Sequence, residues 1–342
     1  MNPASRYLRI VLIVAAIVLG SVGALNYFID PLQHYRPAAY PPLLVKEGRY
    51  RLPGLARHTT AQLITTGTSV TKMQLPSEMK RVFGLDGLNL AMDGASAHEQ
   101  HLLLRLALRT GRVKQVIWDI NFEYLRGTPT WVSDFDGAFP AYLYDDRLPN
   151  DLPHYLLSLD ITKHSLKILT RAYPKHTPDS FQQLPKDFAV GTALVEKAIP
   201  RRLKALPKFR ALIPEFTDAN LHENFRQNYI ALIREYPAVR FRLYFPPFSS
   251  AYMRFTRDHV PELIPPFLAS RAAIFKELAA FPNAELHDIQ SDIPLISDLT
   301  HYADPIHFDR TYHTRVLEII RDGTHRASEP RLAEFSTFLR GQ

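Results

Sequence analysis

The chain has 342 residues, a formal net charge of +7 and no cysteine. The absence of cysteine excludes disulfide bonds, thiolate catalysis and cysteine-ligated metal sites, and the length suffices for one large domain or two medium ones. The Lys and Arg residues are spread along the chain without a dense block. This spread argues against nucleic acid as a partner, because nucleic-acid surfaces need clustered basic residues. The positive balance is consistent with solubility or with weak attraction to anionic envelope surfaces.

The first element in chain order is an uncharged apolar run at residues 10–29, which reads IVLIVAAIVLGSVGALNYFI. About 20 apolar residues are needed to span a bilayer as a helix. Arg6 and Arg9 precede the run, so the positive-inside rule predicts a cytoplasmic N-terminus and an exported globular part. A cleaved signal peptide is the competing interpretation, because residues 22–24 are small. We favour an uncleaved, single-pass anchor in a bacterial cytoplasmic (inner) membrane, with the globular domain on the periplasmic side.

Residues 30–57 are rich in proline and aromatic residues. Proline fixes φ and removes a hydrogen-bond donor, so this stretch predicts an extended connector with no regular element. The globular domain is expected over residues 58–325, and residues 326–342 are expected to form a C-terminal tail.

Beyond the connector, short apolar runs alternate with helical patterns. Strands are expected at 63–66, 87–92, 113–120, 239–245 and 284–289. Helices are expected at about 76–83, 95–109, 217–236, 251–281 and 311–321. Alternation at these spacings predicts an α/β fold with a parallel sheet. Residues 122–214 break the alternation and predict a helical insertion, whose aromatic residues form a small second core more readily than a sugar-binding cleft.

The first strand runs into a turn, Gly67-Thr68-Ser69, with the layout of a nucleophile site. Open parallel sheets bind ligands at the carboxyl ends of their strands. A serine at that edge exposes its hydroxyl, and the N–H groups of the next turn face the same point, as an acyl-transfer nucleophile and its oxyanion require. Alternatively, Ser69 is the N-cap of the following helical turn, and on this stretch alone the cap is favoured.

An irregular polar segment before the last predicted helix contains Asp304 and His307. At this spacing a carboxylate reaches the Nδ1–H of the histidine, fixes its tautomer and stabilises the imidazolium. The free Nε2 then takes a proton from a serine hydroxyl. Asp298 and His301 repeat the spacing, so the motif alone leaves two pairs open, and an ordinary surface histidine is the alternative for each.

These blocks together resemble the SGNH (GDSL-type) hydrolase superfamily. Gly67-Thr68-Ser69 matches the nucleophile block, Gly94 matches the glycine of the second block, and Asp304-Pro305-Ile306-His307 matches the last block. The resemblance covers about residues 60–325 and is closest to the membrane-anchored branch. That branch includes D-alanyl-lipoteichoic acid transfer proteins and periplasmic alginate O-acetylation proteins. It implies a three-layer α/β/α fold of the SGNH or flavodoxin-like type.

The sequence departs from the family pattern in two blocks. The first block lacks the aspartate of Gly-Asp-Ser, which the anchored branch tolerates. The third block, usually Gly-x-Asn-Asp, is absent, and residues 118–121 (WDIN) occupy its position. Asn121 is the candidate for the side-chain oxyanion donor. The alternative is that Asp119 and Asn121 merely end a strand and start a turn.

The resemblance implies a membrane-anchored envelope esterase or O-acyltransferase that acts on a cell-surface or exopolysaccharide glycan. Ser69 would attack an ester, His307 would act as general base and then acid, and Asp304 would orient His307. The backbone N–H groups of Ser69 and Gly94, with Asn121, would hold the oxyanion. A multi-pass membrane acyltransferase would supply the acyl group, and neither a metal nor an organic cofactor is needed.

Two other function classes stay open. The first is a catalytically inactive, membrane-tethered subunit for glycan binding or assembly with the same fold, which the missing third block favours. The second is a metal site made from His301, Asp304 and His307, since two imidazoles and a carboxylate are suitable ligands. No second ligand cluster in the sequence supports the metal site.

Overall fold

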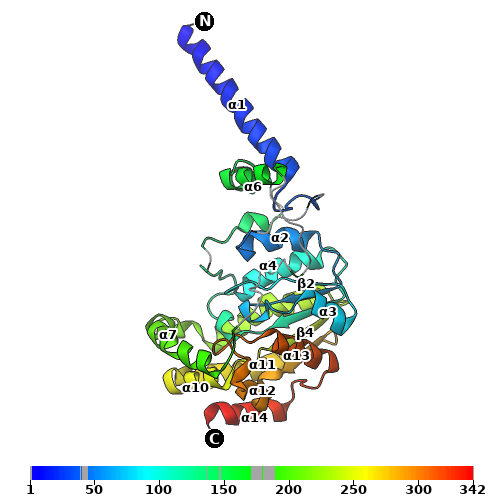
Figure 1. The fold of residues 1–342 in the computed structure, drawn as a ribbon, viewed down its shortest axis with the longest axis vertical. Coiled ribbons are helices and arrows are strands. Elements are labelled where there is room, and N and C mark those ends of the chain that lie inside the picture. The colour runs from blue at the N-terminus through cyan, green and yellow to red at the C-terminus, as the bar shows by residue number, and fades with distance from the viewer. Residues whose placement is uncertain are drawn as a thin grey trace. The chain divides into compact units, whose positions relative to one another are not determined.

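A computed structural model describes residues 2–38, 40, 45–135, 137–145, 148–170, 179 and 189–341 (Figure 1). The chain divides into two compact units. We call residues 1–58 with 139–177 the small unit, and residues 59–138 with 178–342 the sheet unit. The predicted insertion over 122–214 therefore does not form one body, because its residues are shared between the two units.

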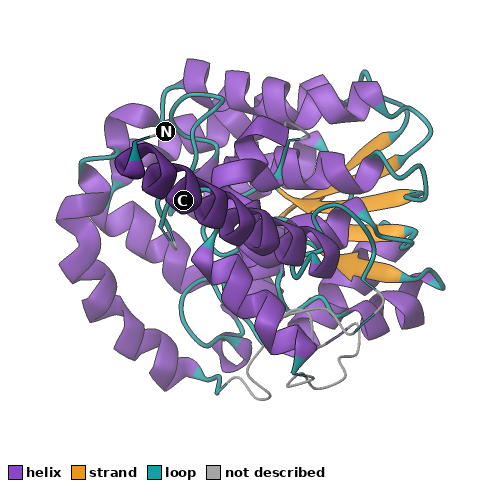
Figure 2. Ribbon diagram, turned by 90° about the horizontal axis from the view of Figure 1, so that it is seen from above, coloured by secondary structure: helices purple, strands orange, loops and turns teal. Residues whose placement is uncertain are grey.

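The sheet unit is built on five strands that pair in parallel in the order β2-β1-β3-β4-β5. The strands are β1 (Leu63–Thr66), β2 (Gly87–Asn89), β3 (Gln115–Asp119), β4 (Arg240–Phe245) and β5 (Ala284–Asp288). Helices lie on both sides of the sheet (Figure 2). This is the flavodoxin-like strand order of doubly wound folds. The predicted parallel α/β fold is confirmed, with each strand inside its expected range.

The helices of the sheet unit follow the predicted alternation. The α-helices are α3 (Pro76–Phe83), α4 (Ala97–Leu108), α7 (Thr192–Arg210), α8 (Asp218–Phe225), α9 (Ala231–Glu235), α10 (Ser250–His259), α11 (Ile264–Leu278), α12 (Ile293–Ser297), α13 (Arg310–Asp322) and α14 (Glu329–Arg340). A π-helical turn, η7 (Arg226–Ile230), joins α8 to α9. Short 3₁₀ turns are η1 (Ser69–Thr71), η2 (Phe122–Tyr124), η6 (Ile213–Glu215), η8 (Pro261–Leu263), η9 (Ile289–Ser291) and η10 (Leu299–His301).

Two apolar layers cover the sheet. On one side, Val316 and Ile320 of α13 and Met79 of α3 belong to one buried cluster with Leu63 and Ile117 of the central strands. Trp118 follows Ile117 in β3 and so points to the other side of the sheet. There its ring stacks on Tyr229 of η7, with the ring centroids 4.0 Å apart. All four residues of β1 and four of the five residues of β3 are buried, as expected of strands covered on both faces.

The predicted C-terminal tail is instead largely helix α14, which packs into the sheet unit. Phe335 and Leu339 are one helical turn apart and both are buried. The Arg271 guanidinium of α11 lies between the rings of Phe245 and Phe335, 4.0 and 4.2 Å from their centroids. The same guanidinium pairs with the buried Asp288 carboxylate of β5 at 2.5 Å. Two apolar residues and one distant arginine therefore fix a segment whose composition predicts a tail.

The small unit contains the apolar N-terminal helix and the helices nearest to it. They are α1 (Pro3–Ile29), α2 (Gly48–Arg57), η3 (Ala141–Leu143), α5 (Leu148–Asp151), the π-helical η4 (Leu152–Leu156) and α6 (Leu159–Leu169). Helix α1 is long and apolar enough to cross a membrane. The structure differs from the predicted extended connector over 30–57, since α2 occupies its last ten residues.

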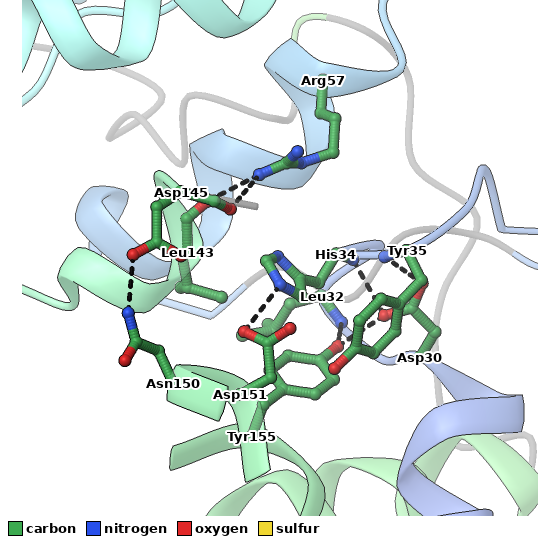
Figure 3. Close-up of polar contacts among 10 residues, drawn as sticks. All are labelled: Asp30, Leu32, His34, Tyr35, Arg57, Leu143, Asp145, Asn150, Asp151 and Tyr155. Carbon is green, nitrogen blue, oxygen red and sulfur yellow. Dashed lines mark hydrogen bonds and ion pairs between the residues drawn. The ribbon is translucent and has the colours of Figure 1, made fainter. Parts of the chain in front are cut away.

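A buried polar cluster organises the chain after α1 (Figure 3). The Asp30 carboxylate accepts hydrogen bonds from the backbone N–H groups of His34 and Tyr35, at 2.8 and 2.9 Å, and from the Tyr155 hydroxyl at 2.7 Å. The His34 ring contacts the Asp151 carboxylate at 3.1 Å. Residues 30–36 therefore form a compact turn that closes on residues more than a hundred positions away, which local composition does not reveal.

The Arg271–Asp288 pair generates a stability prediction. Removing one partner of a buried ion pair leaves an uncompensated charge, so Arg271→Ala should lower the free energy of unfolding by about 3–5 kcal/mol. The control is Arg226→Ala, which breaks a more exposed pair with Glu277 and should cost at most about 1 kcal/mol. Urea unfolding of both variants measures the difference. Equal losses would contradict the buried pair as the anchor of α14.

Candidate active site

Ser69 lies at the carboxyl edge of the sheet, directly after β1. Gly67 leaves the strand with φ of 150°, Thr68 is the N-cap of η1, and Ser69 is the first residue of that turn. Thr68 makes no side-chain capping hydrogen bond to η1. The N-cap interpretation of Ser69 is therefore not what the structure shows. Its half-buried side chain instead directs Oγ to within 2.8 Å of Nε2 of His307.

A chain of short polar contacts links Ser69 to His307 and Asp304. Nδ1 of His307 is 2.7 Å from Oδ2 of Asp304. An ionised carboxylate only accepts hydrogen bonds, so Nδ1 carries the proton and Nε2 accepts from the serine hydroxyl. Two residues separated by 238 positions are thereby joined in the order that proton transfer from a serine requires.

The charge state of the Asp304 carboxyl suits this arrangement. Burial alone would raise its pKa, but hydrogen bonds from the His307 ring and from the N–H groups of Ile306 and His307 lower the pKa to about 2. The neighbouring His313 ring is buried against Phe308, and burial together with His307 lowers its pKa to about 3. Near neutral pH the site therefore holds an ionised Asp304 and an uncharged His313 beside His307.

The loop that carries Asp304 and His307 is fixed by the segment after β4. The Ser249 hydroxyl and N–H both donate to the Pro305 carbonyl, at 2.8 and 3.0 Å. The Tyr302 hydroxyl donates to the Pro247 carbonyl at 2.7 Å, and Tyr302 bridges to Phe308 within the loop. These bonds hold the aspartate–histidine pair on a closed loop, so its position does not depend on a mobile surface segment.

The second aspartate–histidine pair has a different role. Nδ1 of His301 bonds Oδ2 of Asp309 at 2.8 Å, and its ring stacks on Tyr312 with centroids 4.2 Å apart. Asp298 lies farther from the His301 ring, at 3.9 Å, and instead caps η10. Among the described residues, no group of three His, Asp or Glu side chains is arranged to hold a metal ion. The sequence hypothesis of a metal site at His301, Asp304 and His307 therefore finds no support in their geometry.

The oxyanion donors expected from the sequence lie in turns that pack against the turn of Ser69. The Asn121 side chain donates from Nδ2 to Oγ1 of Thr68 at 3.2 Å, and its Oδ1 caps η2. Gly94, with φ of 59°, ends the turn after β2, in which the Met92 N–H donates to the Gly67 carbonyl at 3.1 Å. The structure thus brings the turns of Ser69, Gly94 and Asn121 to one edge of the sheet.

Asp119 is a residue whose role the sequence did not reveal. Its buried Oδ2 accepts from the Thr68 N–H at 2.9 Å and from the Thr71 hydroxyl at 2.6 Å. A Cβ on Gly67 would collide with this carboxylate, so only glycine fits there. Asp119 therefore positions the turn that presents Ser69. The one signal in the sequence is a carboxylate near the end of a mostly apolar strand.

Two cavities share Arg202 of α7, and the larger of the two reaches Asp304. The larger, about 360 Å³, is lined by Asp304 and by one side of α7, including Lys197, Arg201 and Arg202. The smaller, about 110 Å³, is mostly apolar and is lined by Leu206, Phe209, Tyr252, Phe255, Leu263 and others, with Glu123 and Arg202 among them. The Gly191 N–H at the start of α7 donates to the Tyr302 carbonyl at 2.9 Å, which ties α7 to the loop of Asp304.

Comparisons with known proteins add little. No protein-family model matches the chain, and no curated protein matches it. One solved structure with an overall likeness is a Streptococcus pneumonia protein provisionally named a platelet activating factor. It is 12% identical, with 82% of this chain and 94% of that chain covered, at a TM-score of 0.41.

The buried Asp119 generates a pH prediction. Burial raises its pKa to about 6, although hydrogen bonds from Thr71 and Thr68 partly offset the effect. The carboxyl has a lower pKa of about 4 when unfolded, so between these values the folded state binds more protons and stability falls as pH rises. Relative to Asp119→Asn, the wild type should lose on the order of 1–3 kcal/mol of unfolding free energy between about pH 4 and pH 7. Urea unfolding of both proteins across this range measures the difference, and a pH-independent difference would contradict the prediction.

Proposed function

We propose that the chain is a membrane-anchored serine esterase or O-acyltransferase of the SGNH type. The observation that carries the proposal is the contact series from Ser69 through His307 to Asp304 at the carboxyl edge of a parallel sheet. Parallel α/β sheets bind ligands at this edge, and a nucleophile, a base and an orienting carboxylate in hydrogen-bond reach are the parts that acyl transfer needs.

In the proposed reaction His307 Nε2 takes the proton from Ser69 Oγ as Oγ attacks the ester carbonyl. The imidazolium, stabilised by Asp304, then donates this proton to the departing alcohol and leaves an acyl-serine. Water or an acceptor hydroxyl next gives its proton to His307 and attacks the acyl carbon. His307 then returns this proton to Oγ of Ser69 as the bond between Oγ and the acyl carbon breaks. The backbone N–H groups of Ser69 and Gly94, with the Asn121 amide, are the proposed oxyanion donors, each typically worth about 10²–10³ in rate.

The setting of the proposed reaction is the cell envelope. An apolar helix of 27 residues at the N-terminus supports anchoring of the chain in a membrane. Arg6 and Arg9 before the apolar run favour a globular part on the outer, periplasmic side of a bacterial cytoplasmic membrane. There the proposed acceptor is a hydroxyl of an envelope glycan, with the acyl group supplied by a multi-pass membrane acyltransferase.

The cavity beside Asp304 favours an acidic substrate. Three cationic side chains of α7 line it: Lys197, Arg201 and Arg202. Asp304 is the one acidic residue among its lining residues. Cationic walls raise the local concentration of anions. The proposed glycan or ester therefore carries a negative charge close to the reacting group.

The competing function is a catalytically inactive, membrane-tethered subunit that binds or assembles glycans. Two observations favour it: the third family block is absent, and the Asn121 amide already donates to Thr68. The two functions differ in whether Ser69 becomes covalently modified.

A covalent probe separates the two functions. Ser69→Ala should abolish labelling by a fluorophosphonate, and His307→Ala should reduce the labelling rate by at least about 10³-fold, since each removes a member of one catalytic unit. His301→Ala is the control, because it disturbs the Asp309 and Tyr312 contacts but not the Ser69 contact, and it should only reduce labelling. Melting temperatures establish that the variants fold. Wild-type labelling of a folded Ser69→Ala protein would remove Ser69 from the mechanism and favour the inactive subunit.

A charge reversal tests the preference for an acidic substrate. Arg201→Glu should lower kcat/KM for an anionic aryl ester about 5–10-fold relative to a neutral ester of the same alcohol, as expected for a charge pair near the surface. Lys208→Glu, on the same helix but outside the cavity lining, is the matched control and should leave the ratio unchanged. Equal effects of both variants would contradict a local charge preference, because they would show that only the overall net charge matters.

A further inference from the structure

Helix α6 of the small unit carries an exposed apolar face. Leu159, Leu166 and Leu169 are 76%, 50% and 54% exposed, although leucine is ordinarily buried. Their spacing of seven and three residues places them on one side of the helix. Ile161 and Ser165 form the buried side. Such a face on a soluble surface marks an interaction site, so the question is what covers it.

The position of α6 relative to α1 is fixed by a buried amide. Asn26 of α1 is fully buried and donates from Nδ2 to the Thr162 hydroxyl at 2.9 Å and to the Leu156 carbonyl at 2.8 Å. Its Oδ1 accepts from the Ser165 hydroxyl at 2.9 Å. Figure 1 shows α6 beside the C-terminal turns of α1. The amide therefore holds α6 against α1 at a defined position along the axis of α1.

The position at which α6 contacts α1 lies inside the apolar run of α1. The run ends at Ile29, and Asn26 precedes its end by three residues. Gly23 precedes it by six, and its Cα faces Leu157, just before α6. At about 1.5 Å per residue these positions are about 5 and 9 Å below the end of the run. Interfacial helices bury their apolar faces to about 5–10 Å in the headgroup and acyl boundary, which is the same depth.

The polar side chains of α6 suit a lipid surface. Lys163 and Lys167 border the leucine face, and Lys163 is paired with the exposed Asp160 at 2.9 Å. Lysines at the edge of an apolar face extend their ammonium groups to lipid phosphates while their methylene stems stay in apolar surroundings. At the same end of α1, Phe28 and Tyr27 are exposed aromatic residues of the kind found at membrane interfaces.

We propose that α6 lies in the plane of the bilayer interface, with its leucine face immersed among the acyl chains and its lysines at the phosphates. This inference rests on the membrane anchorage proposed for α1. It gives the small unit two points of attachment, a spanning helix and an interfacial helix. Together they fix its tilt on the membrane, whereas a single spanning helix leaves it free to swing.

The absence of native cysteine allows a direct test in the full chain. Single variants Leu159→Cys and Leu166→Cys carry a nitroxide label on the proposed lipid face. Val14→Cys reports the middle of the span, and Leu203→Cys, 40% exposed on α7, is the matched control. Each protein is reconstituted into vesicles of phosphatidylethanolamine and phosphatidylglycerol. Collision with oxygen, which enters lipid, and with a water-soluble nickel chelate is then measured.

The expected result is that labels at 159 and 166 resemble the label at 14, open to oxygen with nickel access lost, while the label at 203 keeps nickel access. Nickel access at 159 and 166 with a shielded Val14 label would overturn the interfacial helix and leave the anchor standing. Shielding of 159 and 166 from both reagents would also overturn it, because it indicates a protein contact such as a second copy. Nickel access at 14 would show that α1 does not span the bilayer and would overturn both the anchorage and this inference. The proposed role of Ser69 would be unaffected, because its test is covalent labelling.

Discussion

The candidate site depends on one buried carboxylate, Asp119, beneath the turn that carries Ser69. Asp119 ends β3, next to the end of β1, because the parallel register pairs Thr66 with Trp118. From there it accepts the Thr68 N–H and the Thr71 hydroxyl and holds the turn between them. The close approach excludes any side chain at Gly67. Substituting either Gly67 or Asp119 would therefore move Ser69 without changing the side chains of Ser69, His307 or Asp304.

The same edge of the sheet collects segments that are distant in sequence. Ser69 follows β1, Gly94 follows β2, Asn121 follows β3, and the loop of His307 is held by residues that follow β4. Ser69, Gly94 and Asn121 lie in turns directly after the carboxyl ends of strands. The loop of His307 is instead hydrogen-bonded to the segment that follows β4. A parallel sheet points all these ends the same way, so one topology gathers the candidate nucleophile, base and oxyanion donors without local sequence proximity.

The sequence predicted what local patterns encode. Apolar runs located the strands, and the spacing of Asp304 and His307 identified a pair that the structure does join to Ser69. It left His301 open as a competitor, because spacing cannot show that its ring is bonded to Asp309. The sequence did not predict that Asp119 positions the turn of Ser69, because this role depends on contacts with Thr68 and Thr71, which are distant in sequence. Helix α14 and the compact turn at Asp30 were missed for the same reason: distant residues decide them.

The docking of α1 on α6 bears on whether the N-terminal helix is retained. A signal peptide is removed without structural loss, so its last turns need no partners in the mature protein. Here Gly23 and Asn26 both face the segment 156–165, and the Asn26 amide contacts four separate groups there. Cleavage at residues 22–24 would cut the helix that presents this amide and free residues 25–29 to fray. Asn26 would then lose ordered partners, and Thr162 and Ser165 would lose theirs, which favours an intact helix. An amide inside an apolar run also costs less when α6 satisfies its hydrogen bonds, so α1 and α6 stabilise each other.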